Sequence, residues 1–118
     1  MAKVWDKTFG GSGMDELYSI VPTSDGGYLL GGSSNSSILG EKFENCRGDI
    51  DYWILKMDAN GNKQWDKTIG GSGEDQVYTL LPIPSGGFLI FGFSDSNISG
   101  EKSENSRGSR DFWTVKVR

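Results

Sequence analysis

The sequence predicts an all-β fold built from short antiparallel strands. Three observations lead to this class: a high glycine content, short apolar runs separated by turn signals, and an internal repeat. The chain has 118 residues, of which 18 are glycine and 35% are hydrophobic. Because glycine weakens helices and no stretch shows sustained helical periodicity, this composition favours strands and turns.

The chain consists of two copies of one unit. Residues 3–58 align without a gap to residues 63–118, and just over half of the aligned residues are identical. For example, WDKTFGGSG in the first copy recurs as WDKTIGGSG in the second. We therefore treat 1–118 as one tandem unit, with repeat boundaries at about 3–62 and 63–118.

The first repeat predicts four antiparallel strands. The sequence DGG at residues 25–27 is a hairpin signal, and Asn-Gly at residues 60–61 is a strong two-residue turn signal. The runs on either side of these turns are rich in Tyr, Trp, Ile, Leu and Val, which favour strands. The predicted strands span residues 17–22, 28–34, 51–57 and 63–69.

The second repeat predicts three strands, at residues 77–82, 88–94 and 111–117. The sequence that matches the fourth strand lies at residues 3–9, as KVWDKTF. A four-stranded antiparallel unit that repeats at this period is typical of a β-propeller blade. The sequence therefore predicts two four-stranded antiparallel propeller blades per chain.

Two blades alone would leave two apolar sheet faces and an unpaired strand edge in water. We therefore expect the ring to close by oligomerisation, with segment 3–9 completing a blade of a neighbouring chain. Three chains would give six blades and four chains would give eight, and the six-bladed trimer is preferred. The alternative is that the chain is a fragment of a longer array of blades.

Each repeat has a long polar loop between its second and third strands, at residues 35–48 and 95–108. Both loops keep the pattern Gly-Glu-Lys-x-Glu-Asn-x-Arg-Gly, whose charged and amide groups suit a hydroxyl-rich ligand such as a glycan. The alternative is a loop whose charges pair with one another. The candidate ligand-binding residues are Glu41, Lys42, Glu44, Asn45, Arg47, Glu101, Lys102, Glu104, Asn105 and Arg107.

A second candidate site lies in the GGSG-x-D segments, which carry Asp15 and Asp75. A carboxylate beside small residues and backbone carbonyls can hold a calcium ion. The same carboxylate can instead accept hydrogen bonds from the backbone amides that precede it and fix the loop. Calcium is thus an open alternative, and no other cofactor is expected.

The composition excludes several classes of function. The chain has no histidine and one cysteine, so histidine bases and metal sites made of several cysteines or histidines are excluded. Its net charge of −4 argues against nucleic-acid binding. No apolar run approaches the roughly 18 residues of a membrane helix, so membrane insertion is not expected. With its carboxylates dispersed over equal copies, the chain is not expected to be an enzyme.

The motifs GGSG-x-D-x-x-Y and D-Y/F-W-x-x-K occur in both repeats. They resemble the bacterial β-propeller repeats of the SBBP type, found in secreted and cell-surface proteins. The chain is also similar to kelch blades at Gly31, Gly32, Trp53 and Trp65, although Phe91 departs from the kelch pattern. This resemblance implies a secreted or cell-surface location and a non-catalytic role. The opening segment MAKVWDK shows no signal peptide, so the expected location rests on the resemblance alone.

Two functions follow as expectations. The first is a multivalent binding module, lectin-like in its recognition of carbohydrate, because identical shallow sites around a ring gain avidity. The second is a structural or adhesive repeat of a bacterial cell-surface protein with no small ligand.

Overall fold

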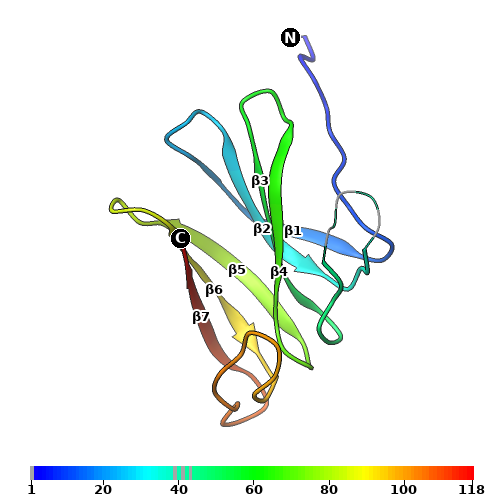
Figure 1. Cartoon of the computed structure of the whole chain (residues 1–118), viewed down its shortest axis with the longest axis vertical. Helices are drawn as coiled ribbons and strands as arrows, with labels where there is room; N and C mark the ends of the chain where they lie inside the picture. Colours follow the sequence, from blue (N-terminus) through cyan, green and yellow to red (C-terminus); the bar gives the residue numbers. More distant parts are fainter. Residues whose placement is uncertain (1, 39, 41, 43) are drawn as a thin grey trace.

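The computed structural model describes residues 2–38, 40, 42 and 44–118. It confirms the all-β class, since the described residues form two antiparallel sheets and no helix, and hence no helix that could cross a membrane. The first sheet has the order β1-β2-β3-β4 and the second the order β5-β6-β7 (Figure 1). The strands are β1 (Asp15–Pro22), β2 (Tyr28–Ser34), β3 (Asp51–Met57), β4 (Lys63–Ile69), β5 (Asp75–Pro82), β6 (Phe88–Ser94) and β7 (Asp111–Val117).

The turns form where the glycine signals predict them. Gly26 and Gly61 both have positive φ, at 84° and 82°, which a side chain at Cβ would disfavour. The first turn is closed by the backbone amide of Thr23, which donates to the carbonyl of Gly27 at 3.0 Å. The β1–β2 and β3–β4 connections are therefore tight hairpins.

Strands β1 and β5 begin two residues earlier than the sequence predicted. Asp15 pairs with Ser34 in the first ladder, and Asp75 pairs with Ser94 in the second. In each pair the serine hydroxyl also donates to the aspartate carboxylate, at 2.6 Å and 2.5 Å. These side-chain hydrogen bonds extend the ladder into a segment that apolar periodicity alone does not mark as strand.

The main core lies between the two sheets, where one face of the first sheet packs on one face of the second. Tyr52 of β3 is fully buried there, and its ring lies 5.0 Å from that of Trp113 on β7. Its hydroxyl donates to the Trp113 carbonyl at 2.9 Å. The buried residues of this core are Leu29, Tyr52, Ile54, Ile69, Val77, Leu80, Phe88 and Ile90.

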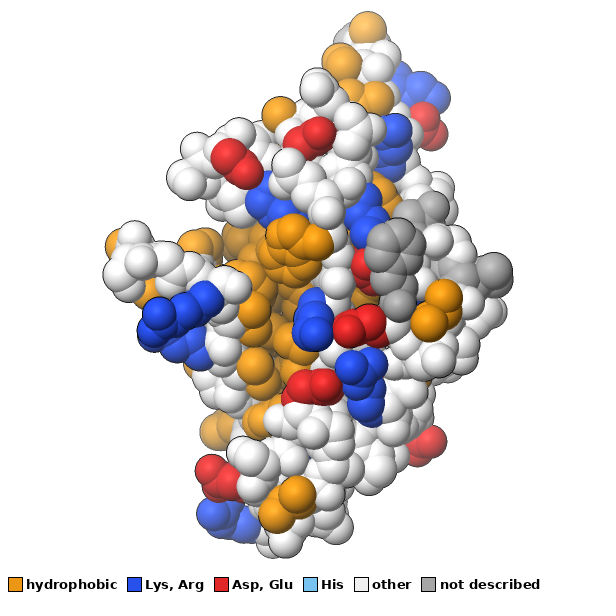
Figure 2. Space-filling model, in the orientation of Figure 1, with side chains coloured by type: hydrophobic (Ala, Val, Ile, Leu, Met, Phe, Trp, Pro, Cys, Tyr) orange, Lys and Arg blue, Asp and Glu red, His pale blue; other side chains and the backbone are white. Residues whose placement is uncertain are grey.

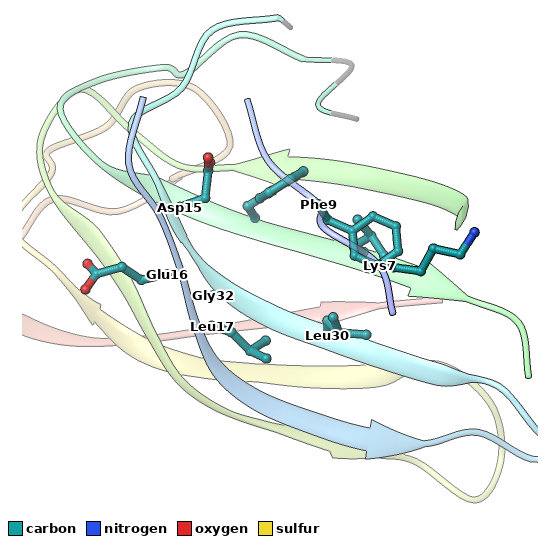
Figure 3. Close-up of a pocket in the computed structure, with 9 residues that line it drawn as sticks. Lys7, Phe9, Asp15, Glu16, Leu17, Leu30 and Gly32 are labelled. Carbon is teal, nitrogen blue, oxygen red and sulfur yellow. The ribbon is translucent and has the colours of Figure 1, made fainter. Parts of the chain in front are cut away.

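Segment 3–9, predicted as a strand of a neighbouring chain's blade, adopts no strand within its own chain. Its last residue, Phe9, packs on the outer face of the first sheet against the cluster of Trp53, Leu55 and Met57. Figure 3 shows Phe9 and Lys7 over this face. The second sheet consequently has three strands and the first has four.

The core between the sheets predicts a matched pair of mutational effects in the second repeat. Ile90 is fully buried, whereas Ile98 is 61% exposed in the following loop. We expect Ile90→Ala to lower the free energy of unfolding by about 2–4 kcal/mol through lost burial and a cavity. Ile98→Ala should change it by less than about 0.5 kcal/mol. Denaturant titration measures both, and similar losses in the two variants would contradict this core.

Candidate functional site

The two GGSG loops are held by the aspartates that follow them. Asp15 accepts hydrogen bonds from the amide of Gly11 at 2.9 Å and from the hydroxyls of Ser34 and Ser36 at 2.6 and 2.9 Å. Because both carboxylate oxygens have partners, this side chain closes the loop onto the end of β2.

Asp75 repeats this arrangement and is fully buried. It accepts from the amide of Gly71 at 2.9 Å and from the hydroxyls of Ser94 and Ser96 at 2.5 and 3.1 Å. Within the described residues, no three acidic, cysteine or histidine side chains gather as metal ligands would. The calcium site therefore stays a prediction without support from these contacts, which are those of a carboxylate that fixes its loop.

The loop between β2 and β3 turns two of the candidate residues inward. Lys42 is fully buried, and its Nζ donates to the carbonyl of Glu44 at 2.5 Å and to the hydroxyl of Thr68 on β4 at 2.8 Å. Burial lowers the pKa of this lysine. The Glu44 carboxylate accepts from the Thr68 amide at 2.8 Å. Both residues therefore hold the loop against β4, while Glu41 lies outside the described residues.

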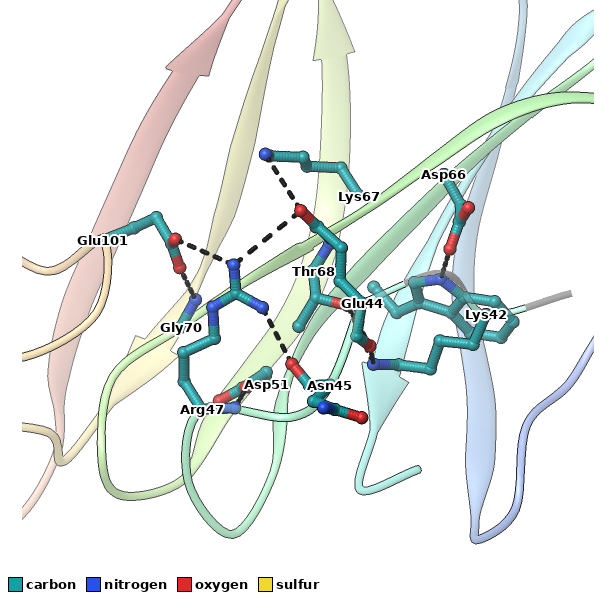
Figure 4. Close-up of polar contacts among 11 residues, drawn as sticks. Lys42, Glu44, Asn45, Arg47, Asp51, Asp66, Lys67, Thr68, Gly70 and Glu101 are labelled. Carbon is teal, nitrogen blue, oxygen red and sulfur yellow. Dashed lines mark hydrogen bonds and ion pairs between the residues drawn. The ribbon is translucent and has the colours of Figure 1, made fainter. Parts of the chain in front are cut away.

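The remaining candidates of this loop are engaged as well. The Asn45 side-chain oxygen accepts from the amide of Ile38 at 2.8 Å, and the Asn45 carbonyl accepts from the Arg47 guanidinium at 2.8 Å. The other side of the guanidinium lies 3.2 Å from the Glu101 carboxylate and 3.8 Å from that of Glu44 (Figure 4).

Glu101 belongs to the second repeat, so this ion pair joins the loops of the two sheets. Its other carboxylate oxygen accepts from the amide of Gly70, at the end of β4, at 2.9 Å. The Glu101 amide in turn donates to the Gly70 carbonyl at 3.0 Å. A polar clamp between the sheets is thus formed by Arg47, Glu101 and Gly70.

The equivalent loop of the second repeat keeps its internal contacts but has fewer partners outside itself. Lys102 Nζ donates to the Glu104 carbonyl at 2.6 Å, and the Asn105 oxygen accepts from Ile98 at 2.9 Å. Arg107 pairs with Glu104 at 3.5 Å, with the two side chains 80% and 75% exposed. The two loops share their charged motif, so the difference in outside partners arises because the first loop is followed by a second sheet, whose Glu101 pairs with Arg47.

A carboxylate that the sequence analysis did not single out, that of Asp51, lies where the two sheets meet, near Asp75. Asp51 at the start of β3 is fully buried and accepts a hydrogen bond from the Arg47 amide. Burial and the nearby Asp75 raise the pKa of Asp51 to about 6. The signal was present, because Asp51 and Asp111 occupy the same position of the two repeats.

Toward the β1–β2 and β5–β6 turns, an apolar cleft of about 560 Å³ opens between the sheets. Figure 2 shows the hydrophobic side chains gathered in this hollow. Trp65 of β4 and Phe88 of β6 stack across it with their ring centroids 6.3 Å apart. Thr23, Ser24 and Lys56 also line the cleft, so it combines aromatic faces with hydroxyls and a cation.

Comparison with known proteins adds no assignment: a scan against protein-family models and a search of the curated proteins both find no match.

The raised pKa of Asp51 predicts a pH-dependent stability. The pKa of about 6 in the folded state lies above the ordinary aspartate value of 3.8. Protonated Asp51 thus contributes stability that is complete below about pH 4 and is lost as the pH rises through 6. Asp51→Asn mimics the protonated form. We expect its free energy of unfolding, relative to that of the wild type, to rise by about 1–3 kcal/mol as the pH increases from 4 to 8.

Asp58→Asn provides a control of opposite sign. Hydrogen bonds from the Asn62 and Asn60 amides lower the pKa of Asp58, so its charged form stabilises the turn. This variant should lose stability at neutral pH and approach the wild type as the pH falls below 4. Denaturant titrations across this pH range measure both variants, and a constant difference between Asp51→Asn and the wild type would contradict the account.

Proposed function

We propose that this chain is a non-catalytic structural module, formed by two blades of a β-propeller whose polar loops lock each blade to the next. The ring closes by oligomerisation, and the six-bladed trimer is the preferred form. Two stacked antiparallel sheets of repeated sequence support the blade assignment. The resemblance to SBBP-type repeats supports a place in a secreted or cell-surface protein.

The polar clamp carries this proposal. The loop motif that both repeats preserve would suit a ligand if its charged groups pointed to solvent. In the first repeat, however, Arg47 binds Glu101 of the next sheet, and Glu101 binds the Gly70 amide. Lys42 is buried against Thr68. These contacts therefore support a structural reason for the repeated motif: it joins each blade to the next.

The same reasoning accounts for the exposed charges of the second repeat. Arg107 matches Arg47 in sequence, yet it is 80% exposed and pairs only locally with Glu104 among the described residues. In a ring, the loop of the following blade would offer it the carboxylate that Glu101 offers to Arg47. Arg107 is thus expected to form the next clamp.

A non-catalytic role agrees with the chemistry of the chain. No histidine is present, and Asp51, the carboxyl with the raised pKa, lies fully buried between the sheets. A general acid or base must reach the proton that it transfers. Asp51 is buried in the interface between the sheets and therefore has no access to a substrate.

Carbohydrate binding is the second candidate function, and the cleft around Trp65 favours it. Trp65 is 39% exposed and stacks with Phe88, and sugar rings pack well on such aromatic faces. The hydroxyls of Thr23 and Ser24 lie at the rim. This location differs from the loop face that the sequence analysis favoured for glycans.

A glycan array on the wild-type protein separates the two functions. The structural module should bind no glycan above background while remaining folded by circular dichroism. Binding that is lost in the Arg47→Ala, Arg107→Ala double variant would instead assign a ligand to the loops. Binding lost in Trp65→Ala would assign it to the cleft, and either result would contradict a purely structural role.

The clamp also predicts a stability effect. Arg47→Ala should lower the free energy of unfolding by about 1 kcal/mol, because it removes a partly buried ion pair that joins the two sheets. Lys67→Ala is the matched control, since Lys67 pairs with Glu44 at 3.3 Å within the first sheet's own loop and strand. It should cost less than about 0.5 kcal/mol. Equal losses in denaturant titration would remove the clamp's special role.

A further inference from the structure

The outer face of the second sheet is apolar and open, whereas the same positions of the first sheet are covered. Tyr52 is fully buried between the sheets, and Phe112, its counterpart on β7, is 96% exposed. A phenylalanine so placed leaves nearly all of its apolar surface in water. The exposed face of the second sheet is thus the counterpart of the face with which the first sheet packs on the second.

The first sheet presents the complementary face. Val77 and Leu80 of β5 are 0% and 3% exposed, because they pack on the first sheet. Their counterparts on β1, Leu17 and Ile20, are 55% and 51% exposed. The chain thus carries both halves of the contact at its two open faces, and a contact between unlike faces can be repeated from molecule to molecule.

The edge of β7 carries the polar groups that hold a fourth strand in the first sheet. There, Lys42 Nζ and the Glu44 carboxylate bind Thr68 of β4, and the Trp53 indole donates to Asp66 at 2.9 Å. The matching residues Lys102, Glu104 and Trp113 line a cavity of about 230 Å³ beside β7.

Segment 3–9 has the sequence that fits this edge. Its residues KVWDKTF match KQWDKTI of β4, so Asp6 and Thr8 correspond to Asp66 and Thr68. Within its own chain the segment forms no strand, and Phe9 instead covers a cavity of about 230 Å³ together with Lys7 and Leu30 (Figure 3). The segment joins β1 through Gly10–Gly13, whose glycines permit a change of direction.

We propose that residues 3–9 of a second copy of this chain add to the edge of β7 as a fourth antiparallel strand, while its first sheet packs on Phe112. The register follows from the β3–β4 ladder, in which Trp53 lies opposite Thr68 and Ile54 opposite Lys67. Thr8 of the second copy then lies opposite Trp113, and Lys7 opposite Thr114. Glu104 accepts the Thr8 amide as Glu44 accepts that of Thr68.

Two substitutions distinguish this contact from the one within the chain. Phe91 and Phe93 stand on the outer face of the second sheet where the first sheet has Gly31 and Ser33. A Cβ at Gly31 would lie 2.8 Å from Leu80 Cγ, so within the chain the two sheets meet there without a side chain. With Phe91 at the matching position, β1 of a second copy must stand farther from the second sheet than β5 stands from the first.

A designed cross-link tests this strand addition. In a Cys46→Ser background, Lys7→Cys and Thr114→Cys place one thiol on the added strand and one opposite it on β7. We expect mild oxidation to give covalent oligomers on a non-reducing gel, with the uncross-linked monomer reduced at least several-fold. Only monomer, or only an intramolecular cross-link, would overturn the proposal. Lys7→Cys paired with Ser24→Cys, in the β1–β2 turn, is the control and should give monomer.

Phe112→Asp in the cross-linkable protein keeps the test independent of folding, because the exposed side chain contributes little to a single chain. It should reduce the oligomeric product several-fold, whereas Ile98→Asp, at another exposed apolar residue, should leave it unchanged. Equal yields in both variants would overturn the docking of the second copy on this face. The inference rests on the proposed ring closure by oligomerisation: an oligomer in light scattering without this cross-link would overturn the strand addition alone, whereas a monomer would overturn both.

Discussion

Each sheet of this chain is apolar on both faces, and burial of those faces is the constraint on which the other features depend. Between the two sheets the constraint is met by a core in which Tyr52, Val77 and Ile90 are fully buried. Burying side chains of this size contributes roughly 1.5–3 kcal/mol each. At the open ends it is not met, since Phe112 stays in water. The proposed ring would meet it there by placing a neighbour on each side.

The polar groups around this core work in the same direction. Apolar faces can slide over one another, whereas the clamp of Arg47, Glu101 and Gly70 has one geometry and so fixes how the sheets sit. Asp51 lies buried beside the clamp, and the charge that it would carry at neutral pH disfavours the contact. The interface therefore combines a strong apolar term with a polar arrangement that sets its register and a carboxyl that makes it pH-dependent.

Much of the fold could be predicted from the sequence, because strand propensity and turn chemistry are local. The boundaries of β2, β3, β4, β6 and β7 follow from apolar runs and from glycine turns such as Gly26 and Gly61. The early start of β1 did not follow, since it depends on the bond between Ser34 and Asp15 across the ladder. Nor could the loop pattern alone reveal that Lys42 is buried, because its partner Thr68 lies on a distant strand.

The central claim is that the contact between the two sheets of one chain recurs between chains. Light scattering coupled to size-exclusion chromatography measures this most directly, as the mass of the wild-type protein at micromolar concentration. The account predicts an oligomer, with three times the chain mass of 12.9 kDa as the preferred value. A stable species of 12.9 kDa would contradict it, since both apolar faces would then persist in water.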